Sequence, residues 1–226
     1  MPHRPRAVAF DIIETTFSLQ SLRPRLQARG LPPAALDVWF TRILRDAFAL
    51  AATGVFVPFT DIATAALHTL AAEHGLAPDA NGDAAVLRGF GELEPQPDAA
   101  EAMQALKAAG IPILAVSNGA AATTRKLLDR SGLAPLVQHV ISVTDIRKWK
   151  PLPDIYRHAA AVAGIAPAEL ALMAVHAWDV HGAKCAGLTT GFVARGQPFP
   201  NFMAAPDISA ESLVEAVNGL IRLPQA

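Results

Sequence analysis

The fold is decided near the start of the chain by the stretch RAVAFDIIETTF, residues 6–17. Its apolar centre, Val8–Phe10, is too short and too rich in strand-forming side chains for a core helix, so it predicts a buried strand. Asp11 follows this strand directly. Ligands of an open α/β sheet bind beyond the carboxyl ends of its strands, which places this carboxylate where chemistry is usually done. Taken alone, Asp11 could be a nucleophile, a metal ligand or a turn former.

Composition limits the classes of protein to which the chain can belong. Its 226 residues can bury a full core, and they suit one large domain or a core with a smaller insert. A formal net charge of -1 gives no reason to expect a nucleic acid or an acidic membrane surface as partner. The longest apolar stretch, Ala47–Phe59, is shorter than a membrane span, and the run that ends at Phe10 is too short for a signal peptide. Because Cys185 is the only cysteine, we expect a soluble cytoplasmic protein without an internal disulfide.

A helical pattern occupies the chain between residues 18 and 97. Its clearest helix begins at Pro32 and Pro33 and carries an apolar stripe at the spacing of one helix face, formed by Leu36, Trp39, Phe40, Ile43, Leu44, Ala47 and Leu50. A second helix is expected to begin at Thr60 or Asp61 and to stop at Gly75. We find no strand signal between these helices, so we expect an all-helical cap, residues 18–97, that covers the end of the first strand.

From residue 98 onward, helical and strand patterns alternate, which predicts a parallel sheet. The expected helices span residues 98–109 and 123–130, a segment after Pro153, and residues 210–220. The expected strands span residues 113–116, 140–143, 172–175 and 191–194. The fold class is therefore α/β, with a core formed by residues 1–17 and 98–226 and interrupted by the cap.

Polar side chains follow four of the predicted strands, all at the edge where such sheets bind ligands. They are Asp11, the pair Ser117 and Asn118, Lys150 in the loop after another strand, and Asp179. Lys150 can hold Asp11 ionised and orient it, as a nucleophilic carboxylate requires. The hydroxyls of Ser117 and Thr15 and the amide of Asn118 can donate hydrogen bonds to a substrate carboxylate or phosphate oxygen.

The chain resembles the haloacid dehalogenase superfamily, in particular its L-2-haloacid dehalogenase (type II) branch. The motifs that carry the resemblance are, in order, Asp11 and Thr15, Ser117-Asn118-Gly119, Lys150-Pro-x-Pro-x-x-Tyr156 and Trp178-Asp179. The resemblance covers essentially the whole chain, including a helical cap between the first two motifs. It implies a Rossmann-like core in which Asp11 is the attacking nucleophile.

The resemblance also implies a reaction in two steps. Asp11 displaces halide from C2 of a short 2-haloacid with inversion and forms an ester, and water then attacks the ester carbonyl. Thr15 would orient Asp11, and Asp179 together with Lys150 would position the water. A dehalogenase of this kind needs no metal and no other cofactor, because halide leaves as an anion without a proton. The expected partner is a small carboxylic acid, and the protein could form a homodimer.

Seven side chains are candidates for contact with the substrate or the halide: Ser117, Asn118, Tyr156, His176, Trp178, Phe40 and Arg42. Ser117 and Asn118 would hold the substrate carboxylate. In typical members of the branch a cap Arg that follows a Trp receives the halide, but here Phe40 follows Trp39. We therefore expect His176 and an aromatic edge to meet the halide, with Arg42 or, more distantly, Arg45 as the substitute cation.

Other departures from the family pattern keep two further functions open. Phosphatases of this superfamily carry a second Asp two positions after the nucleophile and acidic residues that hold Mg²⁺, whereas this chain has Ile13 there and one acid in the stretch 174–179. A phosphoryl dianion facing Asp11 without a cation would meet strong repulsion. Glu14 stands where Gly usually precedes the Thr. The alternatives are a phosphatase with an eroded metal site and a non-catalytic relative that serves as a binding or dimerising module.

Overall fold

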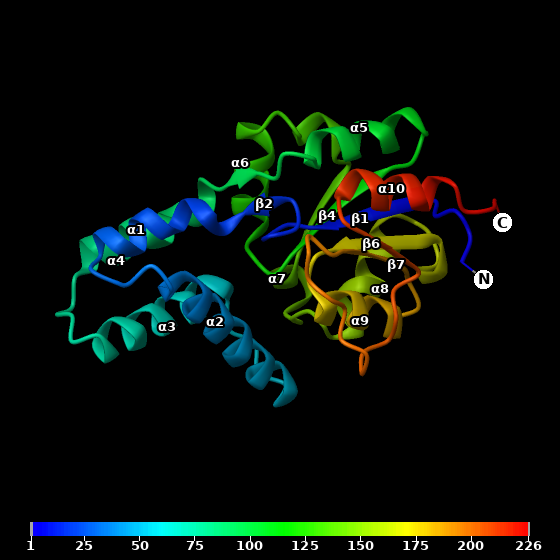
Figure 1. Cartoon of the computed structure of the whole chain (residues 1–226). Coiled ribbons are helices and arrows are strands. Elements are labelled where there is room, and N and C mark those ends of the chain that lie inside the picture. Colours follow the sequence, from blue (N-terminus) through cyan, green and yellow to red (C-terminus); the bar gives the residue numbers. More distant parts are fainter. Residues whose placement is uncertain (1, 226) are drawn as a thin grey trace.

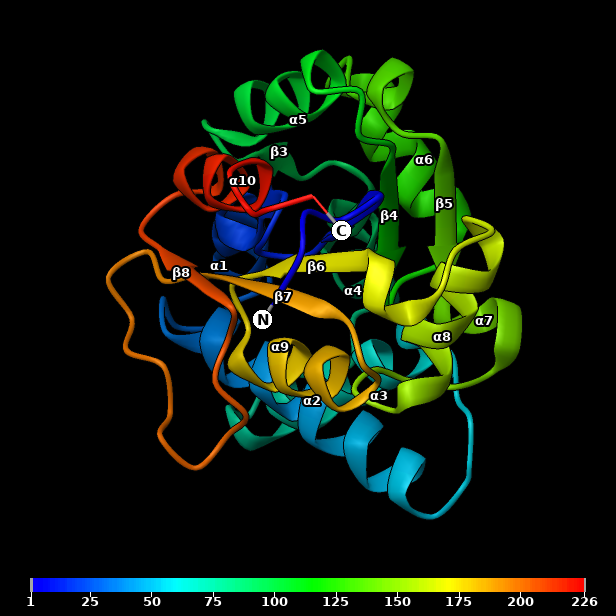
Figure 2. The same cartoon turned by 90° about the vertical axis from the view of Figure 1, so that its right-hand side faces the viewer.

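The structure is a computed structural model that describes residues 2–225. Its centre is a six-stranded parallel sheet with the order β5-β4-β1-β6-β7-β8 (Figures 1 and 2). In chain order the strands are β1 Ala7–Asp11, β4 Ile113–Ser117, β5 His139–Ser142, β6 Leu170–Ala174, β7 Thr189–Val193 and β8 Ile208–Ala210. The strand that ends at Asp11 lies in the middle of the sheet, between β4 and β6. The predicted α/β class with a parallel sheet is confirmed.

The sheet is covered on both faces, and the side chains of β1 alternate between the two apolar layers. Val8 and Phe10 pack in one layer, whereas Ala7 and Ala9 pack in the other. Figure 2 shows α5 and α10 on one side of the sheet and α8 and α9 on the other. The helices of the core are α5 Ala99–Ala108, α6 Ala121–Arg130, α7 Val143–Ile146, α8 Pro153–Val162, α9 Ala177–Cys185 and α10 Leu213–Ile221. Burial on both faces explains why β1 is a continuous apolar run in the sequence.

Four helices lie between β1 and β4 and extend beyond the carboxyl edge of the sheet (Figure 1). Trp39 anchors the predicted apolar stripe, because it is fully buried and its Nε1 donates to the carbonyl oxygen of Ala63 at 2.9 Å. The helical insert predicted from the sequence is thus present, while its proposed bounds, residues 18–97, stay a prediction. The four helices are α1 Arg23–Ala28, α2 Ala35–Ala52, α3 Phe59–Glu73 and α4 Ala80–Arg88.

The expectation that the insert contains no strand is wrong. The segment that leaves β1 pairs with the returning segment in a small antiparallel sheet of β2 Phe17–Ser18 and β3 Glu94–Pro95. Two-residue strands show no alternation of apolar and polar side chains, so the sequence carries no signal for them. The pairing ties together the two crossings between the core and the helical insert.

Two helix starts also differ from the sequence prediction. α3 begins at Phe59 rather than at a capping Thr60 or Asp61, because Pro58 holds the extended backbone before the first turn. α10 begins after Ser212, whose hydroxyl accepts a hydrogen bond from the backbone N–H of Glu215. Ala210, where the helix was expected to begin, is the last residue of β8 instead. Within residues 2–225, no helix is both long enough and apolar enough to cross a membrane.

Gly182 of α9 packs directly against the loop that follows Lys150. A Cβ atom at this position would lie 2.5 Å from the Cβ and 2.7 Å from the carbonyl oxygen of Pro151, and 2.9 Å from the hydroxyl of Tyr156. We predict that Gly182→Ala lowers the free energy of unfolding by about 1 to 3 kcal/mol, because the backbone contact cannot yield. Urea denaturation measures the change. As a control, Gly91→Ala meets only the flexible end of Lys126, and an equal loss in both variants would contradict this packing.

Candidate active site

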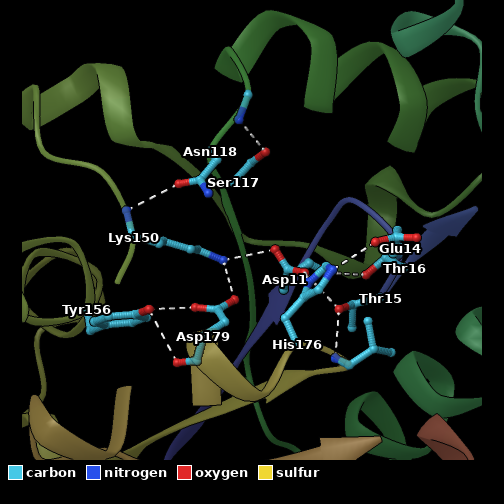
Figure 3. Close-up of polar contacts among 12 residues, drawn as sticks. Asp11, Glu14, Thr15, Thr16, Ser117, Asn118, Lys150, Tyr156, His176 and Asp179 are labelled. Carbon is cyan, nitrogen blue, oxygen red and sulfur yellow. Dashed lines mark hydrogen bonds and ion pairs between the residues drawn. The ribbon is translucent and has the colours of Figure 1, made fainter. Parts of the chain in front are cut away.

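The carboxylate of Asp11 is held at the end of β1 by contacts to both of its oxygens (Figure 3). Oδ1 accepts a hydrogen bond from Lys150 Nζ at 2.9 Å, and Oδ2 accepts one from the hydroxyl of Thr15 at 2.7 Å. Thr15 is itself held, because its Oγ1 accepts a hydrogen bond from the backbone N–H of Val175 at 3.0 Å. The hydroxyl of Thr16 donates to the main-chain oxygen of Asp11. The turn after β1 therefore fixes the position and rotation of the carboxyl group.

Lys150 lies between two carboxylates and is completely buried. Its Nζ is 2.9 Å from Oδ1 of Asp11 and 2.9 Å from Oδ2 of Asp179. Burial acts to lower the pKa of Lys150, but the two negative charges outweigh it and raise the pKa. Burial acts to raise the pKa of Asp11, but the Lys150 ammonium, followed by His176 and Thr15, holds that pKa well below its usual range. Asp11 is therefore an anion at neutral pH.

Asp179 lies in the first turn of α9 and is fully enclosed by protein. Oδ2 accepts from Lys150, and Oδ1 accepts from the hydroxyl of Tyr156 at 2.5 Å. Burial raises the pKa of Asp179, and the Lys150 ammonium offsets this only in part. Tyr156, predicted to contact substrate, is buried behind Asp179, away from Asp11 (Figure 3). Its hydroxyl donates to the carboxylate of Asp179, and the expected contact between Tyr156 and substrate stays a prediction.

A small cavity lies in front of Asp11. The space that the centre of a water molecule can occupy there is about 10 Å³, which is room for about one water, so a substrate can enter only when the walls move apart. The cavity walls are mostly apolar, and α2 and α3 of the helical insert supply three of the lining residues. The lining residues are Asp11, Ile13, Phe40, Leu44, Phe59, Asn118, His176 and Trp178. Four of the sequence candidates for substrate contact are among these: Phe40, Asn118, His176 and Trp178.

Ser117 and Asn118, the two candidates for binding the substrate carboxylate, take different positions. Asn118 is in the cavity wall, and its Oδ1 accepts from the backbone N–H of Lys150 at 3.2 Å. The hydroxyl of Ser117 accepts from the backbone N–H of Gly119, and Ser117 lines a neighbouring hollow instead of the cavity. Of this pair, the structure places only Asn118 beside Asp11. Leu44, which belongs to the predicted apolar stripe, and Phe59, which the sequence analysis did not single out, complete the wall.

Arg42 does not line the cavity, so its expected contact with the halide stays a prediction. Its guanidinium pairs with Glu73 on α3 at 2.7 Å, and Arg45 pairs with its neighbour Asp46. Residues two apart on a helix point in nearly opposite directions, so Arg42 faces away from the cavity that Phe40 lines. The residue that shares the face of Phe40 is Leu44, one turn later.

His176 is the cation of the cavity wall. Its Nε2 lies 2.8 Å from Oε2 of Glu14, and its Nδ1 lies 3.4 Å from Oδ2 of Asp11. The ring stacks on Trp178, with 5.1 Å between ring centroids. Burial acts to lower the pKa of His176, but the contacts with Asp11 and Glu14 outweigh it and raise the pKa to about 9. The imidazole is therefore protonated at neutral pH.

Glu14 was noticed in the sequence only as a departure from the family pattern, without a partner. Its backbone has φ of 67°, in the left-handed region that favours glycine. A non-glycine residue held there costs on the order of 1 kcal/mol. Its carboxylate nevertheless reaches back to His176, which sits 162 positions later in the chain. Both Glu14 and His176 depart from the family pattern, and this was a signal in the sequence. A single sequence gave no means of linking the two departures.

No group of three or more His, Cys, Asp or Glu side chains within residues 2–225 is arranged to hold a metal ion. The acidic groups near Asp11 are committed elsewhere, since Asp179 pairs with Lys150 and Glu14 pairs with His176. Ile13 projects an apolar side chain into the cavity wall. The charges in this site are therefore balanced by side chains of the chain itself.

Comparison with known proteins gives consistent relatives. A family model described as haloacid dehalogenase-like hydrolase matches residues 5–187. The (S)-2-haloacid dehalogenase of Xanthobacter autotrophicus is 32% identical over 192 residues, which cover 84% of this chain and 75% of the relative. The (S)-2-haloacid dehalogenase 1 of Pseudomonas sp. (strain CBS-3) is 28% identical over 223 residues, which cover 97% and 98%.

Solved structures agree with these relatives. The L-2-haloacid dehalogenase from Xanthobacter autotrophicus with chloropropionic acid covalently bound superposes with a TM-score of 0.86 at 27% identity, covering 95% of this chain and 97% of the other. A structure described as a dehalogenase with intermediate complex gives a TM-score of 0.89 at 26% identity, covering 98% and 100%. The likeness extends over both the sheet and the helical insert.

We predict that Lys150→Met lowers the free energy of unfolding by about 3 to 5 kcal/mol, because it leaves two buried carboxylates without their cation. Urea denaturation at neutral pH gives the value. Lys148→Met makes the same substitution two residues earlier at an exposed position, and it should change the stability by less than about 0.5 kcal/mol. If the two variants were equally stable, the ion pairs of Lys150 would not organise the site.

Proposed function

The chain belongs to the haloacid dehalogenase-like hydrolase family, and on that basis we propose that it cleaves the carbon–halogen bond of short 2-haloacids through an ester on Asp11. The observation that carries the proposal is the ionised carboxylate of Asp11, held by a buried ammonium at the wall of a small and mostly apolar cavity. The curated relatives are (S)-2-haloacid dehalogenases, and one similar solved structure holds chloropropionic acid covalently.

In the first step Asp11 attacks C2 of the acid from the side opposite the halogen. One carboxylate oxygen forms a bond to carbon while the carbon–halogen bond breaks, and the halide leaves with its electron pair. Thr15 and Lys150 fix the direction of attack. The apolar walls keep water from the carboxylate, which strengthens every charge interaction in the cavity. No proton is needed at this stage, which agrees with the apolar side chain of Ile13 beside the nucleophile.

The departing halide and the substrate carboxylate need donors on the cavity wall. We propose that protonated His176 faces the halide, with Phe40 and Trp178 beside it. Asn118 is the donor for the substrate carboxylate, because its Oδ1 is held by Lys150 and its amide N–H groups remain for a ligand. Lys150 and Asp179 keep the carboxyl group of Asp11 in place when water attacks the ester.

The helical insert completes this site in the proposal. Residues 18–97 form a cap on a core of residues 1–17 and 98–226, and the cap contributes Phe40, Leu44 and Phe59 to the cavity. A cap that closes over Asp11 would exclude bulk water during the first step. A cytoplasmic location and assembly into a homodimer are further proposals from the sequence.

The nucleophile is tested by Asp11→Asn. We predict that this variant folds normally but releases no halide from 2-chloropropionate, because an amide cannot displace halide at a useful rate. Halide release is measured with and without a chelator, beside phosphate release from an aryl phosphate. Halide release by purified Asp11→Asn, with deamidation excluded by mass spectrometry, would refute the mechanism. Chelator-sensitive phosphate release by the unaltered protein would favour the phosphatase alternative.

The halide donor is tested by the pH dependence of the first step. With His176 as the donor, the single-turnover rate of halide release should fall as pH rises through about 9, because the imidazole then loses its proton. His176→Asn should slow this step by roughly ten- to a hundredfold and remove that dependence, since a charge-assisted hydrogen bond is worth about 1.5 to 3 kcal/mol. Arg42→Met should stay within about twofold of the unaltered protein. An equal effect of both substitutions would show that the donor is misassigned.

A further inference from the structure

His176 separates two hollows of the molecule. One is the cavity in front of Asp11. The other, which we call the vestibule, is open to solvent and is lined mainly by polar side chains, including Glu14, Gln20, Gln96, His176, Arg195 and Gln197. The side chain of His176 is 14% exposed, so it lies in the wall between the two spaces. Among the residues that the structure describes, His176 is the one that lines both hollows.

The two nitrogens of His176 have different surroundings. Nε2 is fixed by Glu14 at 2.8 Å, and the ring plane is fixed by Trp178. Nδ1 is buried, points toward the carboxyl group of Asp11 and makes no hydrogen bond of good geometry with any residue in the described part of the chain. Figure 3 shows the ring between Asp11 and Glu14. Nδ1 is therefore held in a fixed orientation, has no hydrogen-bond partner among residues 2–225, and lies beside the carboxyl group of Asp11 that water must attack.

Asp179, the other acid near Asp11, is poorly placed to activate that water. It is fully buried, it does not line the cavity, and both of its oxygens accept hydrogen bonds, from Lys150 and from Tyr156. Lys150 is a cation between two carboxylates and has no lone pair to accept a proton. Among the side chains that line the cavity, His176 is the only titratable one besides Asp11 itself.

We propose that His176 is the general base for hydrolysis of the ester on Asp11, that Glu14 is its positioning residue, and that water arrives and a proton departs through the vestibule. This inference rests on the proposed function. It extends the role of His176 from the halide-releasing step to the second step, and it gives Glu14 a reason to occupy a backbone conformation that favours glycine.

The charge on His176 must change between the two steps. In the resting site the imidazolium faces Asp11 and Glu14, Lys150 pairs with Asp11, and Arg195 also lines the vestibule. Alkylation removes the negative charge of Asp11, so the pKa of His176 falls and the ring releases a proton to solvent. The neutral ring can then accept a proton from water. Halide departure thus converts the group that assisted it into a base.

The atoms and protons of the second step balance. Water oxygen forms a bond to Cγ of Asp11 while one of its protons moves to Nδ1 of His176. The bond between Cγ and the ester oxygen then breaks, and His176 returns that proton to the leaving oxygen, which gives a 2-hydroxy acid. The carboxylic acid left on Asp11 transfers its proton to His176 and restores the resting pair. One proton is released for each halide.

The test separates the two steps in Glu14→Gln, which keeps the side-chain shape and removes the charge. With excess 2-chloropropionate at about pH 6, where the imidazole remains protonated in the resting site, rapid quenching should show a halide burst close to that of the unaltered protein. The following steady rate should fall by roughly a hundredfold, within the range of general-base catalysis. Mass spectrometry should find the ester accumulated on Asp11. Glu14→Asp should recover part of the lost rate.

Two further variants exclude a merely structural role. Glu14→Gly relieves the left-handed backbone, so it should leave the melting temperature unchanged or raise it and still slow hydrolysis of the ester. If Glu14→Gln folds poorly, Glu14→Gly provides the same test of the second step. Glu73→Gln makes the same acid-to-amide change in the ion pair between α2 and α3, and its halide burst and steady rate should match those of the unaltered protein.

The outcomes distinguish this inference from the function on which it rests. An unaltered protein that releases no halide from any short 2-haloacid overturns both. A normal halide burst in Glu14→Gln and Glu14→Gly, with a steady rate within about twofold of the unaltered protein and no ester on Asp11, overturns the role of the pair alone. In that case the proposed function stands, and the base must lie elsewhere.

Discussion

The structure depends on one buried charge, the ammonium of Lys150. Moving an ion of this kind out of water costs several kcal/mol, so it must be balanced by nearby charges and hydrogen bonds. Asp11 and Asp179 supply that balance from two different elements, β1 and the first turn of α9. The extra negative charge is in turn met by the hydroxyls of Thr15 and Tyr156. A change in any member leaves a buried charge without its partner.

This constraint also explains how the core and the helical insert divide the work. The core brings the charged groups together at the carboxyl edge of its parallel sheet, where Asp11 is the last residue of the buried strand β1. The insert adds Phe40, Leu44 and Phe59, which are apolar and donate nothing. A carboxylate that faces such walls keeps its charge through Lys150 and is poorly hydrated, and both conditions increase its reactivity toward carbon. The polar vestibule lies on the other side of His176, so solvent and nucleophile meet through one side chain.

Much of the fold and the charged centre could be predicted from the sequence, because parallel strands bring their carboxyl ends to one edge. That rule alone places Asp11, Lys150 and Asp179 together. The directions in which side chains point were harder to predict than the positions of the strands. Arg42 was expected near the halide from its distance in sequence to Phe40, but helix geometry turns it toward Glu73. The pairing of Glu14 with His176 joins residues far apart in the chain and has no local pattern.

The central claim is that Asp11 bonds to the substrate carbon before water takes part. A single turnover in ¹⁸O-labelled water, with enzyme in excess over 2-chloropropionate, tests it most directly. The account predicts that the 2-hydroxy acid of this first turnover carries unlabelled oxygen from Asp11, while mass spectrometry of the peptide that contains Asp11 finds the label in its carboxyl group. Label in the product of the first turnover, with an unlabelled Asp11, would mean that water attacks the substrate directly and would contradict the account.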